Sequence, residues 1–215
     1  MERGLFITFE GIDGTGKSTQ ACLLAEKLKK HGFSVVLTRE PGGTPLAEKI
    51  RALLLYEKEI NLAPVTEVML YAAARAQHVA EVIWPALHRG EIVICERFSD
   101  STLAYQGYAT GIDRNLIQKA DSIATGGLVP DLTFLLDLET TEGWARVRER
   151  NNGKQDRMEA KGSSFLEKVR NGYLAIATQE ENRVKNINCS GKKVSEVQKI
   201  IWEILLKRIN CREGK

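Results

Sequence analysis

A glycine-rich loop near the amino terminus carries the strongest chemical signal in this sequence. Residues 10–19 read EGIDGTGKST, which fits GxxxxGK[ST] between an apolar run and a helix-like stretch. Glycines let backbone N–H groups converge on phosphate oxygens, Lys17 can reach the outer phosphates, and the Ser18 hydroxyl can ligate Mg²⁺. A tight turn without a ligand is the alternative, but it does not require the Lys-Ser pair. The predicted phosphate-binding residues are Gly11, Ile12, Asp13, Gly14, Thr15, Gly16, Lys17, Ser18 and Thr19.

Asp13 is an acid inside a loop that binds negative charge. Its carboxylate cannot face phosphates without repulsion, so we expect it to point toward a group that donates hydrogen bonds, such as a sugar hydroxyl. On the residues alone, an Asx turn in which Asp13 only satisfies the loop backbone stays open.

Short apolar runs alternate with longer amphipathic stretches and must position this loop. The runs at 5–9, 35–37, 92–95 and 133–138 are apolar on both faces, as buried parallel strands are. A fifth strand, around 184–189, has few apolar positions. The alternation predicts an α/β fold with three layers around a doubly wound parallel sheet of five strands, in which ligands bind beside the carboxyl ends of the strands.

Three helices have recognisable ends in the sequence. The first follows the loop and can end near Gly32, because glycine tolerates the left-handed closing conformation. Residues 64–84 predict a long helix that is closed or bent at Pro85. Ser195 and Gln198 predict a capping-box start for the last helix.

Composition narrows the classes of function. The chain has 215 residues, 43% of them hydrophobic, which predicts a single domain over 1–215. A formal charge of +3 is too small for a nucleic-acid binder and favours a small anionic ligand. Signal-peptide features and apolar runs of roughly 20 residues are both missing, so we expect a cytoplasmic protein without a membrane partner. Four cysteines without CxxC spacing argue against a zinc site or a disulfide framework.

The loop is accompanied by four further stretches, in a fixed order. They are TREPGGT at 38–44, YAAAR at 71–75, CERFSDSTLAYQG at 95–107 and RERNNGKQDRME at 148–159. Together with the loop, they resemble the bacterial-type thymidylate kinases, over about residues 4–180. The resemblance implies a P-loop nucleoside monophosphate kinase fold with a small basic lid at about 146–160. It also implies ATP with Mg²⁺ as phosphoryl donor, dTMP as acceptor, and a homodimer.

The resemblance implies an acceptor site drawn from these stretches. In it, Asp13 receives the sugar 3′-hydroxyl and Arg97 clamps the acceptor phosphate. Tyr71 stacks on thymine beside Arg75, which addresses the thymine O4, and Tyr105 lies against the sugar 2′ carbon and excludes a ribose hydroxyl. The remaining implied members are Thr102 and Gln106 at the thymine edge, Arg39 at the monophosphate, Glu40 as an organiser of the site, and Pro41 in its wall.

Residue types alone leave plainer interpretations open for these stretches. Tyr71 and Arg75 share a helical face, but a core tyrosine and a surface arginine would have the same spacing. Pro41 fits a turn between a strand and a helix, and the basic run after residue 146 fits a solvated helix face.

Catalytic groups are implied on both sides of the transferred phosphoryl group. Lys17 serves the donor and Arg97 the acceptor. The loop itself supplies no arginine, since Gly14 stands where eukaryote-like members can carry one, so the implied transition-state arginine lies in the lid. Arg150 is the first choice and Arg148 the second, because one arginine can neutralise the charge of the transferring group.

Two carboxylates compete for the implied metal site. Glu96 stands before Arg97 where the family usually has aspartate, and with Ser18 it forms the predicted Mg²⁺ site. Asp137, at the end of a predicted strand, is the second choice.

Two other functions remain open on the sequence. One is a kinase of another nucleoside monophosphate on the same scaffold, and the other is a P-loop ATPase that acts as a switch on a protein partner. The missing guanine-reading NKxD motif and the motifs for a second nucleotide-sized pocket argue against the switch.

Overall fold

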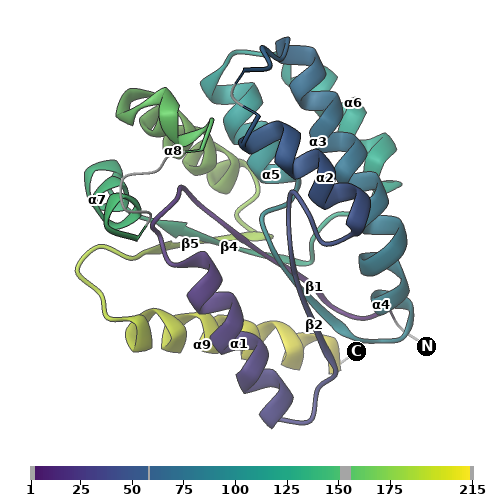
Figure 1. Cartoon of the computed structure of the whole chain (residues 1–215). Coiled ribbons are helices and arrows are strands. Elements are labelled where there is room, and N and C mark those ends of the chain that lie inside the picture. Colours follow the sequence, from purple (N-terminus) through teal and green to yellow (C-terminus); the bar gives the residue numbers. More distant parts are fainter. Residues whose placement is uncertain (1–2, 58, 151–155, 214–215) are drawn as a thin grey trace.

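The computed structural model describes residues 3–57, 59–150 and 156–213 (Figure 1). Five parallel strands form one sheet in the order β2-β3-β1-β4-β5. The predicted doubly wound parallel sheet is therefore confirmed, including its weakly apolar fifth strand. The strands are β1 (Phe6–Glu10), β2 (Val35–Arg39), β3 (Ile92–Glu96), β4 (Leu132–Asp137) and β5 (Val184–Asn188).

Helices cover both faces of the sheet and give the three predicted layers (Figure 1). On one face lie α1 (Lys17–Lys30) and α9 (Val194–Glu213), which pack against each other. A further helix, α7 (Thr140–Arg150), lies beyond the edge where the strands end. The opposite face carries α2 (Pro45–Leu55), α3 (Pro64–His78), α4 (Trp84–His88), α5 (Ser99–Thr102), α6 (Arg114–Thr125) and α8 (Ser163–Gln179).

Successive strand residues contribute to different hydrophobic clusters. Ile7 and Phe9 of β1 pack in the cluster that includes α1 and α9, whereas Phe6 packs with Val79 and Ile83 on the other side. Because helices cover both faces, β1 is buried along its whole length. This double burial explains the continuous apolar runs of β1, β3 and β4, whereas β2, at the edge of the sheet, is only partly buried.

The predicted helix over 64–84 is present but not uniform. It runs as α3, continues through a π-helical turn at Val79–Ile83, and becomes α4. Pro85 lies in the first turn of α4, directly after the π-helical turn, so the helix does not end at Pro85 but continues to His88. Figure 1 shows these segments running along the side of the sheet.

The first helix ends as predicted, but the cap of the last helix is different. His31 caps α1, and Gly32 follows with φ of +86°. The last helix begins at Val194, so Ser195 already lies inside it. The Glu196 carboxylate accepts the Lys193 N–H at 2.7 Å, which places this side-chain contact before the predicted pair. In the described part of the chain, no helix is sufficiently long and apolar to traverse a bilayer.

Candidate active site

The glycine-rich loop links β1, the central strand, to α1. Gly11, Gly14 and Gly16 have φ of +133°, +85° and +91°, a region that glycine enters without strain. A Cβ atom on Gly14 would lie 2.3 Å from the Gly143 carbonyl oxygen, so α7 packs directly on the loop backbone. An arginine therefore has no room at position 14.

Lys17, the first residue of α1, lies close to Asp13 of the loop. Lys17 is buried, and its Nζ donates a hydrogen bond to the Ile12 carbonyl oxygen at 2.8 Å. The same Nζ lies 3.7 Å from Asp13 Oδ1. Burial, followed by the nearby Arg97, lowers the pKa of Lys17 to about 8, against the opposing pull of the Asp13 carboxylate.

The predicted metal ligands lie next to each other. Ser18 Oγ donates to Glu96 Oε2 at 2.7 Å, because β1 and β3 are neighbours and Phe9 is in register with Glu96. A hydroxyl and a carboxylate are hard oxygen ligands, and Mg²⁺ completes its shell with water and substrate phosphates. This donor set fits Mg²⁺ although the described residues contain no cluster of three His, Cys, Asp or Glu side chains that could hold a metal. Asp137 instead forms a bidentate pair with Arg170 at 2.7 and 3.0 Å.

Arg97 contacts both the glycine-rich loop and residues of the predicted acceptor site. Its Nη2 donates to Asp13 Oδ1 at 2.7 Å and approaches the Tyr105 hydroxyl at 3.4 Å, and its Nη1 donates to the Gly11 carbonyl oxygen at 3.0 Å. The Asp13 carboxylate thus engages a strong hydrogen-bond donor, as expected for its chemistry. Arg97 has φ of +66°, which is unusual for a residue with a side chain.

A buried acid that the sequence analysis missed lies behind Arg97. Glu10, the last residue of β1, accepts hydrogen bonds from the Phe98 N–H at 2.7 Å, Ser101 Oγ at 2.6 Å and the Tyr173 hydroxyl at 3.0 Å. Burial, and secondarily the charge of Asp100, raises the pKa of Glu10 to about 7. In the sequence, its position directly before the glycine-rich loop could have identified Glu10 as a site residue.

Arg75 forms a second centre of charge with two of the predicted residues. Its Nε donates to Glu40 Oε2 and its Nη1 to Asp121 Oδ1, both at 2.8 Å, while its Nη2 donates to Thr102 Oγ1 at 3.0 Å. Only 2% of Arg75 is exposed, so the alternative of a surface arginine is wrong. Burial alone would lower the pKa of Arg75, but Glu40 and Asp121 outweigh it and raise that pKa.

One face of α3 supplies further site residues at helical spacing. Tyr71 lies one turn before Arg75 and is half-buried. One turn before Tyr71, Glu67 accepts a hydrogen bond from Gln106 Nε2 at 2.8 Å. After Arg75, the buried His78 places Nδ1 3.0 Å from Glu40 Oε1. The helical spacing in the sequence could have identified Glu67 and His78 as site residues, whereas no nearby sequence pattern pointed to Asp121 on α6.

Of the residues at the end of β2 and just after it, some lie in the buried site and others at the surface. Glu40 lies with Arg75, but the side chain of Arg39 is exposed and pairs with Glu48 at 3.1 Å. Pro41 follows a cis peptide bond, and its carbonyl oxygen accepts from Arg51 Nη1 at 2.8 Å.

The lid predictions fall partly outside the described residues. Arg148 is exposed on α7, whereas residues 151–155 and the side chain of Arg150 are not described. Arg146 was not among the predicted site residues, yet its Nη1 donates to the Gly14 carbonyl oxygen at 3.2 Å. Arg146 therefore joins α7 to the glycine-rich loop.

Comparisons with known proteins agree with this geometry. Residues 9–201 match the family model for thymidylate kinase. The thymidylate kinase of Syntrophotalea carbinolica is 46% identical over 97% of this chain and 98% of its own length. That of Geobacter sulfurreducens is 47% identical over 97% of this chain and its full length.

A solved structure extends the likeness to three dimensions. The crystal structure of thymidylate kinase from Ehrlichia chaffeensis superposes with a TM-score of 0.73 and is 37% identical, covering 94% of this chain and 99% of that chain. The order of the strands, the loop before α1 and the arginines at the strand ends thus occur on a fold shared with that enzyme. Together with the matched family model, they show that this chain belongs to the thymidylate kinase family.

Proposed function

We propose that this chain transfers the γ-phosphoryl group of ATP to the 5′-phosphate of dTMP, yielding dTDP and ADP. One observation carries the proposal beyond family membership. Asp13 Oδ1 lies 2.7 Å from Arg97 Nη2 and 3.7 Å from Lys17 Nζ, so one carboxylate joins the donor loop to the proposed acceptor arginine. Two anionic nucleotides can meet end to end at this point.

In this proposal, the donor phosphates lie on the loop between β1 and α1. Backbone N–H groups, the amino-terminal end of α1 and Lys17 all present positive charge there. Ser18 and Glu96 would hold the Mg²⁺ ion, which neutralises phosphate charge when bound. The longer Glu96, in place of the usual aspartate, already reaches the Ser18 hydroxyl.

The acceptor would be gripped by separate phosphate, sugar and base contacts. Arg97 holds the 5′-phosphate and the Asp13 carboxylate accepts the 3′-hydroxyl, while the buried ring of Tyr105 blocks a 2′-hydroxyl. Arg75 addresses the thymine edge from a fixed position, because Glu40 and Asp121 hold its guanidinium. The other proposed acceptor contacts are stacking by Tyr71, the thymine edge at Thr102 and Gln106, the monophosphate at Arg39, and the wall of the site at Pro41.

No side-chain nucleophile is needed for this reaction. The acceptor phosphate oxygen attacks the γ-phosphorus directly, and the protein contributes positioning and charge. Lys17 and Arg97 hold the two reacting phosphates, and Arg150, with Arg148 as second choice, is the proposed lid arginine that stabilises the transferring group.

A panel of nucleoside monophosphates with ATP tests this function. We expect dTMP to be the best acceptor and AMP, GMP and CMP to be poor ones. The kcat/KM for dUMP should be about 10- to 200-fold lower than that for dTMP, because the two bases differ by one methyl group. The ribose analogue of dTMP should be rejected more strongly, since in this proposal the Tyr105 ring lies against the sugar 2′ carbon. The measurement is ADP release in a coupled assay.

The panel also separates the competing functions. Equal turnover of AMP and dTMP would contradict the proposed acceptor and favour another monophosphate kinase. Rapid ATP hydrolysis in the absence of any acceptor would favour the switch-type ATPase instead.

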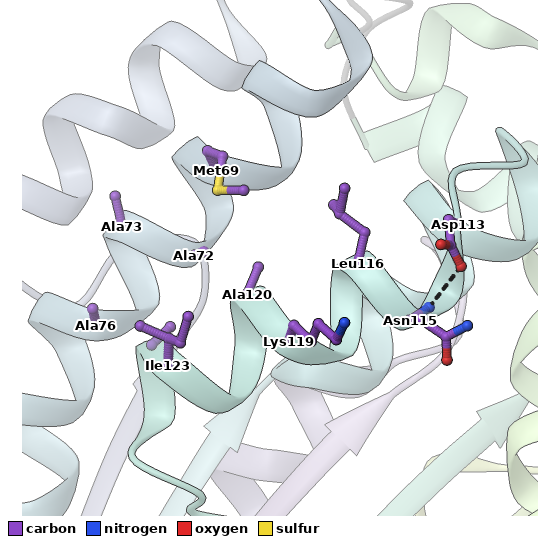
Figure 2. A pocket seen from close by; sticks show the side chains of 11 residues that line it. Met69, Ala72, Ala73, Ala76, Asp113, Asn115, Leu116, Lys119, Ala120 and Ile123 are labelled. Carbon is purple, nitrogen blue, oxygen red and sulfur yellow. Dashed lines mark hydrogen bonds between the residues drawn. The ribbon is translucent and has the colours of Figure 1, made fainter.

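We further propose that the chain forms the homodimer that the family resemblance implies, and that the two copies associate through the exposed apolar surface of α2, α3 and α6. A groove of about 580 Å³ runs between α3 and α6, with Met69 and Leu116 on opposite sides (Figure 2). Ile123, at one end of this groove, is 84% exposed, and Met69 is 48% exposed. Other exposed apolar side chains on these helices are Leu46, Leu53 and Val65.

A charge on this surface should prevent association. We expect Ile123→Glu to be monomeric in sedimentation equilibrium at concentrations where the unchanged protein is a dimer, because the carboxylate would be desolvated in the interface. Leu206→Glu, on α9 at the opposite face of the sheet, is the matched control and should remain dimeric. A dimer of unchanged affinity in Ile123→Glu would show that this surface is not the interface.

A further inference from the structure

The buried acid behind Arg97 is unused by the mechanism above. Glu10 accepts hydrogen bonds from both hydroxyls that Arg97 Nη1 contacts. Arg97 Nη1 donates to the Tyr173 hydroxyl at 3.0 Å and to Ser101 Oγ at 3.3 Å, and these two oxygens lie 2.7 Å apart. Glu10 Oε2 accepts from both of them.

Hydrogen-bond polarity runs in one direction through this network. The Arg97 guanidinium can only donate, and an ionised Glu10 can only accept. Each hydroxyl between them therefore accepts from Arg97 and passes its own proton toward Glu10, directly or through the other hydroxyl. A neutral group at position 10 would carry a donor of its own. One hydroxyl proton would then point toward the guanidinium and weaken the hydrogen bond that Arg97 donates to that hydroxyl.

Glu10 also fixes the backbone next to Arg97. Its Oε1 accepts the Phe98 N–H at 2.7 Å, one residue after the positive φ of Arg97. A residue with a side chain persists in that region only when its surroundings hold it there. The same carboxylate thus restrains both the backbone turn and the guanidinium.

We propose that Glu10, through the hydroxyls of Ser101 and Tyr173, is the positioning residue that holds Arg97 in the orientation required by the acceptor phosphate. This inference rests on the proposed role of Arg97 and adds three residues to it. The elements involved are distant in sequence: Glu10 ends β1, Ser101 lies on α5, and Tyr173 lies on α8.

Tyr173→Phe is the sharpest test, because it removes one oxygen and keeps the ring. We expect KM for dTMP to rise about tenfold, as for the loss of a hydrogen bond to a charged group, with KM for ATP within about twofold of its original value. Thr8→Val is the matched control. It removes the buried Thr8–Thr133 hydroxyl contact of 2.7 Å, on the same strand as Glu10 but away from Arg97.

Glu10→Gln tests the charge itself. The groups that face Glu10 are Arg97, Asp100, Lys17, Cys95 and the Tyr173 hydroxyl. Because the Glu10 pKa is about 7, the unchanged protein should lose acceptor affinity as pH falls from 8 to 6. Glu10→Gln should bind dTMP weakly throughout. The KM for dTMP of Glu10→Gln, divided by that of the unchanged protein, should therefore be largest at pH 8 and decrease toward pH 6. Titration of dTMP itself affects both proteins equally and cancels in this ratio.

The outcomes distinguish this inference from the proposed function. Equal KM for dTMP in Tyr173→Phe and Thr8→Val, in a protein that phosphorylates dTMP, would overturn the positioning role alone. A protein that never phosphorylates dTMP would overturn the proposed function. If Glu10→Gln does not fold, Tyr173→Phe and Ser101→Ala decide the question, and their effects on KM should be less than additive because both hydroxyls serve one network.

Discussion

Lys17→Ala is expected to lower kcat by about 10²- to 10³-fold or more, with dTMP affinity nearly unchanged. Removing one preorganised electrostatic contact to a developing charge has a cost of this size. Lys17 is buried beside the loop, and the closer partner of Asp13 is Arg97, at 2.7 Å against 3.7 Å for Lys17. The measurement is steady-state transfer at saturating ATP and dTMP, together with calorimetric binding of dTMP.

The control for this change lies on the same helix. Lys30, at the exposed end of α1, should be replaceable by alanine without loss of transfer. Melting temperatures of both variants should stay close to that of the unchanged protein, because the alanine at position 17 removes a cation whose burial is itself unfavourable. Full turnover in Lys17→Ala would show that the glycine-rich loop is not the donor site.

Arg150→Ala is expected to lower kcat by about 10³-fold while KM for dTMP changes only a few-fold. An arginine that stabilises the transferring phosphoryl group acts in the transition state, so its loss affects the rate and leaves substrate affinity nearly unchanged. Since Gly14 has no room for a side chain, the loop cannot replace it. Single-turnover kinetics with saturating ATP would measure the chemical step directly.

Two neighbouring arginines serve as comparisons for Arg150. Arg148→Ala tests the second choice, and Arg146→Ala removes the described contact to the Gly14 carbonyl oxygen. We expect Arg146→Ala to affect KM for ATP more than kcat, since that contact is made on the donor loop. If Arg150→Ala changed only KM, the transition-state arginine would be Arg148 or Arg146, and the larger loss of kcat between those two variants would identify it.

The sheet and the glycine-rich loop were predictable because their signals are local. Strands buried on both faces read as apolar runs, and the loop follows a fixed spacing of residue types. The weak fifth strand was placed correctly despite Lys185 and Asn186, because its two buried positions, Val184 and Ile187, suffice for an edge strand with one neighbour. The cap at Ser195 was wrong because Glu196 accepts the Lys193 N–H, two residues before the N–H that the predicted pair of Ser195 and Gln198 requires.

The supporting groups of the site were harder to predict, since they come from distant elements. Asp121 reaches Arg75 across 46 positions and Tyr173 reaches Glu10 across 163. No spacing rule links such residues before the fold is known. Glu10 and Glu67 were closer to prediction, because one directly precedes the loop and the other lies two helical turns before Arg75.

The close packing of Gly14 against Gly143 ties the geometry of the lid to that of the donor loop. A Cβ on Gly14 would meet a backbone oxygen at 2.3 Å, and one on Gly143 would meet the Asp13 carbonyl oxygen at 2.9 Å. To restore ordinary contact, α7 would have to move outward by roughly 1 Å for a side chain at position 14 and by roughly half as much for one at position 143. Because the arginines lie farther along α7, that tilt would be amplified where they act. A side chain at position 14 or 143 is therefore compatible with this packing only if α7 as a whole shifts.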